Sequence, residues 1–145
     1  MDENNRYYSS DSFGVLYNKD KTVLEELPGG FEGEYVVPEG VREIHVNGCS
    51  RLTKLTVPGS VVSSGISGCE NLTNIVFQEG VEHIDLYRCD NLSSVSIPAS
   101  VTVIVEAAFE DCKNLESAVI PGSVGQLNSH LFENCEKLSK VTLGE

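Results

Sequence analysis

The sequence predicts a mainly β fold, a solenoid of stacked coils of 20–23 residues with an N-terminal β-hairpin in front of it. Five cysteines at positions 49, 69, 89, 112 and 135 are each followed three residues later by a leucine. The stretch at 52–57 has a strand-like alternation that places Leu55 and Val57 inward and Lys54 and Thr56 outward. A unit of about 20 residues cannot bury its own apolar face, so successive units must pack on one another.

The repeat divides the chain into two parts. Residues 1–40 form an N-terminal segment that leads into the first coil, and residues 41–145 form the repeat array. Each unit opens on a valine, carries the cysteine and leucine, and ends in most copies at a proline that stops the strand. The five units are residues 41–60, 61–80, 81–100, 101–123 and 124–145.

The last two units are three residues longer than the others, with "AAF" and "HLF" inserted ahead of the cysteine. We expect each insertion to form one short helical turn, with the rings of Phe109 and Phe132 filling the core. In the N-terminal segment, "GVLY", "NKDK" and "TVLEELP" read as strand, polar turn and strand, which predicts a hairpin. Tyr35 and Val37 then open the array, because "GEYVVPEG" repeats the ending of "LTVPGS".

Charge and composition exclude several classes of function. The net charge is −12, from 22 acidic and 10 basic residues, which argues against binding to nucleic acid or to an anionic membrane. No apolar run approaches the 18 or so residues of a membrane span, so we expect no membrane insertion. The first residues also lack the order of regions found in a secretory signal.

The cysteines are predicted to be structural. One position used five times cannot own a separate base at each copy, as nucleophilic catalysis would require. Equivalent Cβ atoms in adjacent coils lie about 4.8 Å apart, beyond the roughly 3.8 Å of a disulfide. We therefore expect five reduced, buried thiols, and neither C-x-x-C nor zinc-ligand spacing occurs.

The remaining candidates for chemistry favour structural readings. We interpret His45, His83 and His130 as exposed bystanders and the scattered acids as a solvated face. "NKDKT" echoes a calcium loop but lacks the glycine at its sixth position and the acid at its twelfth, so a hairpin turn is the better reading. Asn71 and Asn91 fit glycosylation sequons, and turn chemistry explains them equally. We therefore predict no enzyme activity, no catalytic residue, no cofactor and no metal.

The outward strand positions are what the repeat leaves free for a partner, since solenoids bind along such faces. They are small and rich in hydroxyl groups, and a simple solubilising face explains them as well as a binding face does. These positions are Thr53, Lys54, Thr56, Thr73, Asn74, Val76, Ser93, Ser94, Ser96, Glu116, Ser117, Val119, Ser139, Lys140 and Thr142.

The unit "VTVIVEAAFEDCKNLESAVIPGSV" resembles the repeat of the BspA-like leucine-rich repeat family, a family of cell-surface repeat proteins. The resemblance covers about 100 residues, although units 41–60, 61–80 and 81–100 lack the Ala-Phe element. The "GVLYNKDKT-x-L" region resembles a segment that often separates repeat blocks in that family, so the chain reads as a piece of a longer protein.

The resemblance implies a leucine-rich-repeat solenoid in a surface or secreted protein of anaerobic bacteria or protists. It also implies adhesion to a protein or extracellular-matrix ligand, and it carries no catalytic residues. Two functions remain open: a non-catalytic protein-binding module, and a structural spacer block without a ligand of its own.

Overall fold

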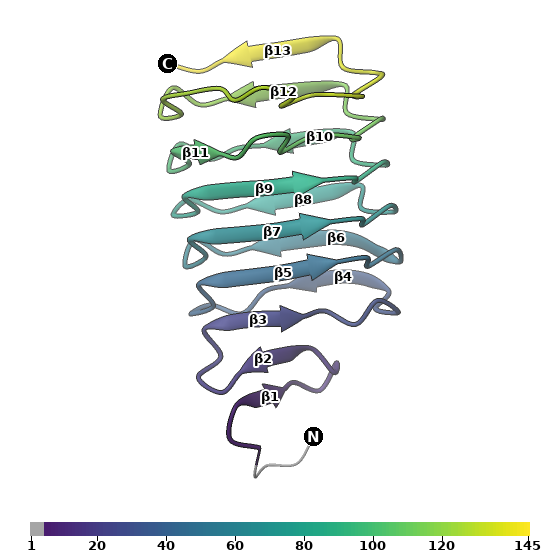
Figure 1. The fold of residues 1–145 in the computed structure, drawn as a ribbon, viewed down its shortest axis with the longest axis vertical. Helices are drawn as coiled ribbons and strands as arrows, with labels where there is room; N and C mark the ends of the chain where they lie inside the picture. Colours follow the sequence, from purple (N-terminus) through teal and green to yellow (C-terminus); the bar gives the residue numbers. More distant parts are fainter. Residues whose placement is uncertain (1–4) are drawn as a thin grey trace.

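The computed structural model describes residues 5–145 as a flattened stack of coils, with the N-terminal strands at one end of the stack and the last coil at the other (Figure 1). Each coil crosses from one sheet to the other, and the apolar core lies between the two sheets. Sheet A has seven strands, in the order β1 (Tyr8–Ser10), β2 (Leu16–Asn18), β3 (Val23–Glu26), β5 (Glu43–Asn47), β7 (Ser63–Ser67), β9 (His83–Tyr87) and β11 (Val103–Ile104). Sheet B has six, in the order β13 (Lys140–Leu143), β12 (Ser117–Ile120), β10 (Ser94–Ser96), β8 (Asn74–Phe77), β6 (Leu52–Val57) and β4 (Gly33–Val36).

The N-terminal hairpin is confirmed. Strands β2 and β3 pair antiparallel, and β1 adds to β2 in the same way. The Asn18 side chain holds the turn, because its Oδ1 accepts the N–H groups of Thr22 and Val23 at 2.8 and 3.0 Å. From β3 onward every pairing is parallel, so the hairpin forms the end of a parallel stack.

The predicted first coil is also confirmed. Strand β4 pairs with β6 in the parallel sheet, with Tyr35 opposite Leu55. Tyr35 and Val37 are both buried. The register is kept from coil to coil, which places equivalent residues directly above one another: Leu55 pairs with Ile75, and Val95 pairs with Ala118. A column of apolar side chains is the direct result of the repeat length.

The expected helical turns are wrong. Residues 5–145 contain no helix, and residues 106–111 and 129–134 form successive turns instead. Ala107 and Asp111 each have a φ of +58°, in the left-handed region that a right-handed helix cannot include. The inserted sequence "AAF" did not indicate this conformation, because neither alanine nor phenylalanine favours a positive φ.

Bonding between coils explains why turns replace the helix. The N–H of Phe109 donates to the carbonyl of Leu131 at 3.0 Å, and the N–H of Asp111 donates to that of Glu133 at 2.9 Å. A helix would consume these groups within its own segment. The expected role of the aromatic ring holds for Phe109, which is fully buried and stacks on Phe132 with ring centroids 5.5 Å apart.

A left-handed residue precedes every cysteine. This conformation turns the chain from sheet A toward sheet B and points the thiol inward, and glycine adopts it at least cost. The residues are Gly48, Gly68, Arg88, Asp111 and Asn134, with φ values of +66°, +62°, +54°, +58° and +58°.

The N-terminal end of the core is closed by a network around Asp11. The carboxylate accepts the N–H groups of Phe13 and Val15 through Oδ1, at 2.9 and 3.0 Å. Its Oδ2 accepts the hydroxyls of Tyr17 in sheet A and Tyr35 in sheet B, at 3.3 and 3.2 Å, and the two hydroxyls also contact each other. Burial raises the pKa of both phenols, which keeps them protonated as donors. One side chain therefore ties both sheets to the hairpin.

Replacement of Arg88 by glycine should stabilise the fold, because arginine holds a left-handed backbone there at a cost of roughly 1 kcal/mol. Its ion pair with Asp111 contributes little, because the two groups are 3.7 Å apart and the guanidinium is exposed to water. We expect Arg88→Gly to raise the free energy of unfolding by about 0.5–1 kcal/mol in urea titrations. Gly68→Ala is the reciprocal control. It should lower the free energy of unfolding by about 1 kcal/mol, because alanine must then adopt a positive φ. The added Cβ meets no atom closer than 3.6 Å, so no steric clash adds to this loss. A loss of stability in Arg88→Gly would contradict this account.

Removal of the Asp11 carboxylate should open the N-terminal end of the core. It removes the acceptor of the Phe13 and Val15 N–H groups and leaves the two buried phenols only each other as partners, so Asp11→Ala should lower the free energy of unfolding by about 1–3 kcal/mol. Asp20→Ala, in the exposed hairpin turn, is the control and should change it by less than about 0.5 kcal/mol. Equal effects of the two substitutions would show that the network does not hold this end.

Candidate binding face

The outward face of sheet B carries the predicted partner positions in straight columns. One column runs through Glu34, Lys54 and Asn74, and its continuation through Ser94, Ser117 and Lys140 is also in register. The second column alternates valine with a hydroxyl residue. Its members are Val36, Thr56, Val76, Ser96, Val119 and Thr142.

The structure brings all the predicted positions to one side of the stack. Thr53, Thr73, Ser93, Glu116 and Ser139 lie next to the columns, toward the cysteine turn. Lys54, Thr56 and Ser117 are half-buried, and the remaining members of the predicted set are exposed. These side chains are a continuous surface, as the sequence analysis expected, and their geometry does not by itself show a ligand.

The centre of this face carries no charge. We call it the neutral patch, and it consists of Asn74, Val76, Ser94, Ser96, Ser117 and Val119 on β8, β10 and β12. At the N-terminal side it is bordered by the ion pair of Lys54 with Glu34, whose Nζ and Oε2 atoms lie 3.1 Å apart. Lys140 on β13 borders it at the other side. Val76 and Val119 are 39% and 50% exposed.

An asparagine ladder lies beside these columns, at the turns after Cys69, Cys89 and Cys112. The Nδ2 of Asn91 donates to the Oδ1 of Asn71 at 3.2 Å, and the Nδ2 of Asn114 donates to the Oδ1 of Asn91 at 3.3 Å. Asn71 itself donates to the backbone carbonyl of Ser50 at 2.7 Å. Asparagine stands two positions after the cysteine in three units, which is a sequence signal for the ladder that the separate interpretations of Asn71 and Asn91 as turn residues did not use.

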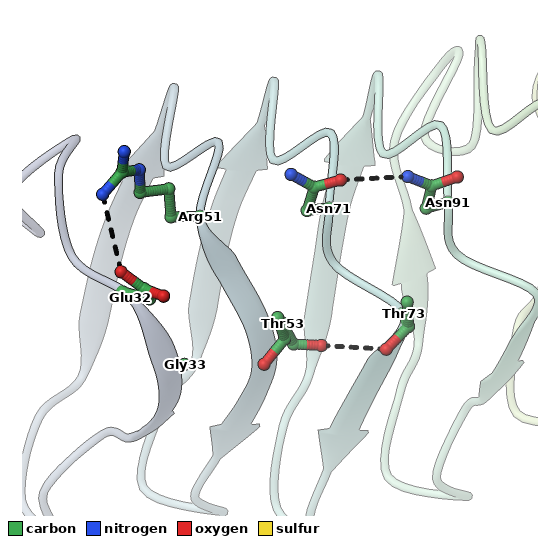
Figure 2. A pocket seen from close by; sticks show the side chains of 7 residues that line it. All are labelled: Glu32, Gly33, Arg51, Thr53, Asn71, Thr73 and Asn91. Atoms are coloured by element: carbon green, nitrogen blue, oxygen red, sulfur yellow. Dashed lines mark hydrogen bonds and ion pairs between the residues drawn. The ribbon is translucent and has the colours of Figure 1, made fainter.

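An open concavity of about 660 Å³ lies where this ladder meets the hydroxyl residues (Figure 2). The Thr73 hydroxyl donates to the carbonyl of Thr53 at 3.2 Å, and Arg51 lies 3.5 Å from Glu32 across the entrance. The concavity is lined by Glu32, Gly33, Arg51, Thr53, Asn71, Thr73 and Asn91. Amides and hydroxyls can exchange hydrogen bonds with a polar partner. Neither threonine hydroxyl of this lining is hydrogen-bonded to a carboxylate or an imidazole that could act as its base.

The cysteines form an internal column of unbridged thiols. All except Cys135 are fully buried, and Cys135 is half-buried in the last coil. The Cys49 thiol donates to the carbonyl of Leu27 at 3.3 Å, and the Cys135 thiol donates to that of Phe109 at 3.1 Å. Burial raises the pKa of the Cys112 thiol to about 12, and it raises the pKa of Cys135 as well. A thiol held protonated is a poor nucleophile.

The histidines are spread over the molecule. The Nε2 of His45 lies 3.2 Å from Glu43, the Nδ1 of His130 lies 2.6 Å from Glu133, and His83 is exposed on sheet A. Within residues 5–145 no three side chains of the kinds that bind metals come together. The same residues include no helix that could cross a bilayer.

A match to a family profile shows the family of this chain. The profile of the BspA type leucine-rich repeat region matches residues 39–145 in six copies. The chain belongs to the BspA-type leucine-rich repeat family. Among curated protein sequences, no significant match is found.

Solved structures of bacterial proteins share this fold. A leucine-rich cell-surface protein of Faecalibacterium prausnitzii superposes with a TM-score of 0.88 at 28% identity, over 96% of this BspA-type chain and 40% of that protein. The T. pallidum leucine-rich repeat protein superposes with a TM-score of 0.71 at 26% identity, over 94% of this chain and 68% of that protein. The pneumococcal vaccine antigen PcpA superposes with a TM-score of 0.89 at 23% identity, over 97% of this chain and 37% of that protein, and this likeness shows the fold alone. The BspA-type chain thus spans less than half of the first and last of these proteins.

The buried Cys112 thiol should destabilise the protein at alkaline pH. The folded state keeps Cys112 protonated, whereas the unfolded chain releases that proton above about pH 8.5, so stability falls as pH rises. This group alone should lower the free energy of unfolding by about 1.4 kcal/mol per pH unit between about pH 9 and 11. Urea titrations across that range should give a shallower slope for Cys112→Ala, whatever its stability at pH 7. Parallel curves for the two proteins would refute the role of this thiol.

Proposed function

We propose that this chain is a non-catalytic binding module of a cell-surface or secreted protein, and that it holds a protein or extracellular-matrix ligand on the outward face of sheet B. The observation that carries the proposal is the neutral patch. Its six outward positions are uncharged in a chain with 22 acidic and 10 basic residues. Depletion of charge at the centre of a patch, with charges at its rim, is typical of protein interfaces.

The geometry of the patch suits an extended partner. Its columns follow the sheet in register, so a partner that lies across several coils meets an outward side chain about every 4.8 Å, and in the second column a valine at every second coil. The valine side chains offer apolar contact, and the neighbouring hydroxyls and ladder amides offer hydrogen bonds. Such a face binds through many modest contacts rather than through one aromatic anchor.

The relatives support a surface role in general terms. The F. prausnitzii protein is a cell-surface protein and has the same coils over nearly the whole of this chain. A module of this kind would present its face away from the cell as part of a longer protein. A spacer block without a ligand would show the same stack, so the two functions are separated by binding and not by fold.

A binding assay with matched variants tests the proposal. Lysine at Val76 and Ser96 places two charges at the centre of the patch, and both positions are exposed, so folding should be unaffected. The control places one lysine at Ser63 and one at His83, exposed on the outward face of sheet A. Each protein is titrated onto a panel of purified extracellular-matrix proteins by biolayer interferometry.

We expect the wild type and the sheet A variant to bind a member of the panel with the same affinity. The Val76→Lys/Ser96→Lys variant should bind it at least tenfold more weakly, because the inserted charges lose hydration at the interface. Equal binding by the two variants would move the site off sheet B. Absence of binding by the wild type to every ligand would favour the spacer.

A further inference from the structure

The turn that follows β5 contains the pair Asn47 and Gly48, and both residues are exposed to solvent. Asn47 is the only asparagine in the sequence that is followed by glycine. In such a pair the backbone nitrogen of glycine can attack the side-chain amide of asparagine, because no Cβ blocks the approach and glycine tolerates the required backbone rotation. Asn47 is therefore the asparagine of this chain that is most open to this reaction.

The space beside the pair is open as well. Gly48 has a φ of +66°, and a Cβ built at this residue would meet no atom within 4 Å. The side chain of Asn47 lies in the outward column of sheet A that continues through Ser67 and Tyr87. Hydroxide and water, the two reagents that the reaction needs, therefore reach both groups from the solvent.

Two hydrogen bonds to Ser67, in the next coil, restrain the pair in the folded chain. The N–H of Gly48 donates to the carbonyl oxygen of Ser67 at 2.8 Å, and the hydroxyl of Ser67 donates to Oδ1 of Asn47 at 2.6 Å. The first bond keeps the attacking nitrogen protonated, and the second holds the side-chain amide in place. The reaction therefore requires a local opening of the turn that breaks both bonds.

We propose that Asn47 is a site of spontaneous deamidation and that Ser67 sets its rate. The nitrogen of Gly48 loses its proton to hydroxide and bonds to Cγ of Asn47. The bond from Cγ to Nδ2 then breaks, and Nδ2 takes a proton from water and leaves as ammonia. Water opens the resulting succinimide ring at either of its carbonyl groups. The net reaction consumes one water, releases one ammonia and leaves aspartate or isoaspartate at this position.

The two products differ in their effect on the fold. Isoaspartate adds a methylene group to the main chain ahead of Gly48, whereas aspartate keeps the backbone length and adds one negative charge. Gly48 is stacked closely on the neighbouring turns, since a Cβ at Gly29 would lie 3.5 Å from its carbonyl oxygen and one at Gly68 would lie 3.6 Å from its nitrogen. A displaced Gly48 disturbs both turns, and only the isoaspartate product has this effect.

Peptide mapping of the 145-residue chain by liquid chromatography and mass spectrometry tests the proposal, after incubation at mildly alkaline pH with and without urea. We expect Asn47 to deamidate at least tenfold more slowly in the folded chain than in urea, because the folded chain reacts only through the opened turn. Ser67→Ala should raise the folded rate about three- to tenfold, since it removes one hydrogen bond, and should leave the rate in urea unchanged. Asn71, which is followed by leucine, should remain intact over the same interval.

A second serine variant separates local opening from unfolding of the whole chain. The hydroxyl of Ser100 donates to the carbonyl of Val81 at 2.7 Å and accepts the N–H of Gly80 at 2.9 Å, in a turn that leads from sheet B back to sheet A. Ser100→Ala should therefore deamidate at Asn47 at the wild-type rate. Equal acceleration by the two serine variants, no effect of Ser67→Ala, or equal wild-type rates with and without urea would overturn the proposal.

Discussion

Hydrogen bonding between successive coils is the interaction on which this structure depends. A coil cannot satisfy its own backbone groups, so strands, turns and inserted residues all direct N–H groups to a neighbour. The asparagine ladder extends the same bonding to side chains. Burial of the apolar columns follows from this bonding, because register between the strands places like residues above like residues. Stability is then a sum over neighbouring coils rather than a property of one central core.

Much of the fold could be predicted from the sequence, because the regular spacing of the repeat determines which residues of successive coils pair with one another. The spacing of Cys49, Cys69 and Cys89 fixes the coil length, and the alternation from Leu52 to Val57 fixes the inward face. The hairpin followed from the polar "NKDK" turn between two apolar runs. The prediction of helical turns was wrong for a physical reason. Hydrogen bonds to carbonyl groups in the neighbouring coil, and not local helix propensity, determine the conformation around Ala107 and Asp111.

The candidate site could be predicted only in outline. Outward positions follow from the alternation of residues along each strand, so the residues of the face were predicted from the sequence. The concavity was not, because it depends on how the turn after Cys69 stands above the turn after Cys49, and a single unit contains no such information. The Asp11 network was also missed, since its tyrosines come from two sheets and are separated by 18 residues in sequence. Contacts between dissimilar segments leave no periodic trace.

The closed N-terminal end has a consequence for the order of folding. The hairpin and its Asp11 network leave the ribosome before the repeats of residues 41–145, and residues 11–35 supply every side chain of the network. Each further coil closes a loop of only 20–23 residues onto a finished edge, so the entropic cost of adding it stays the same along the array. The repeat array is therefore suited to growth in one direction during synthesis, with each new coil added on the C-terminal side of the coils already formed.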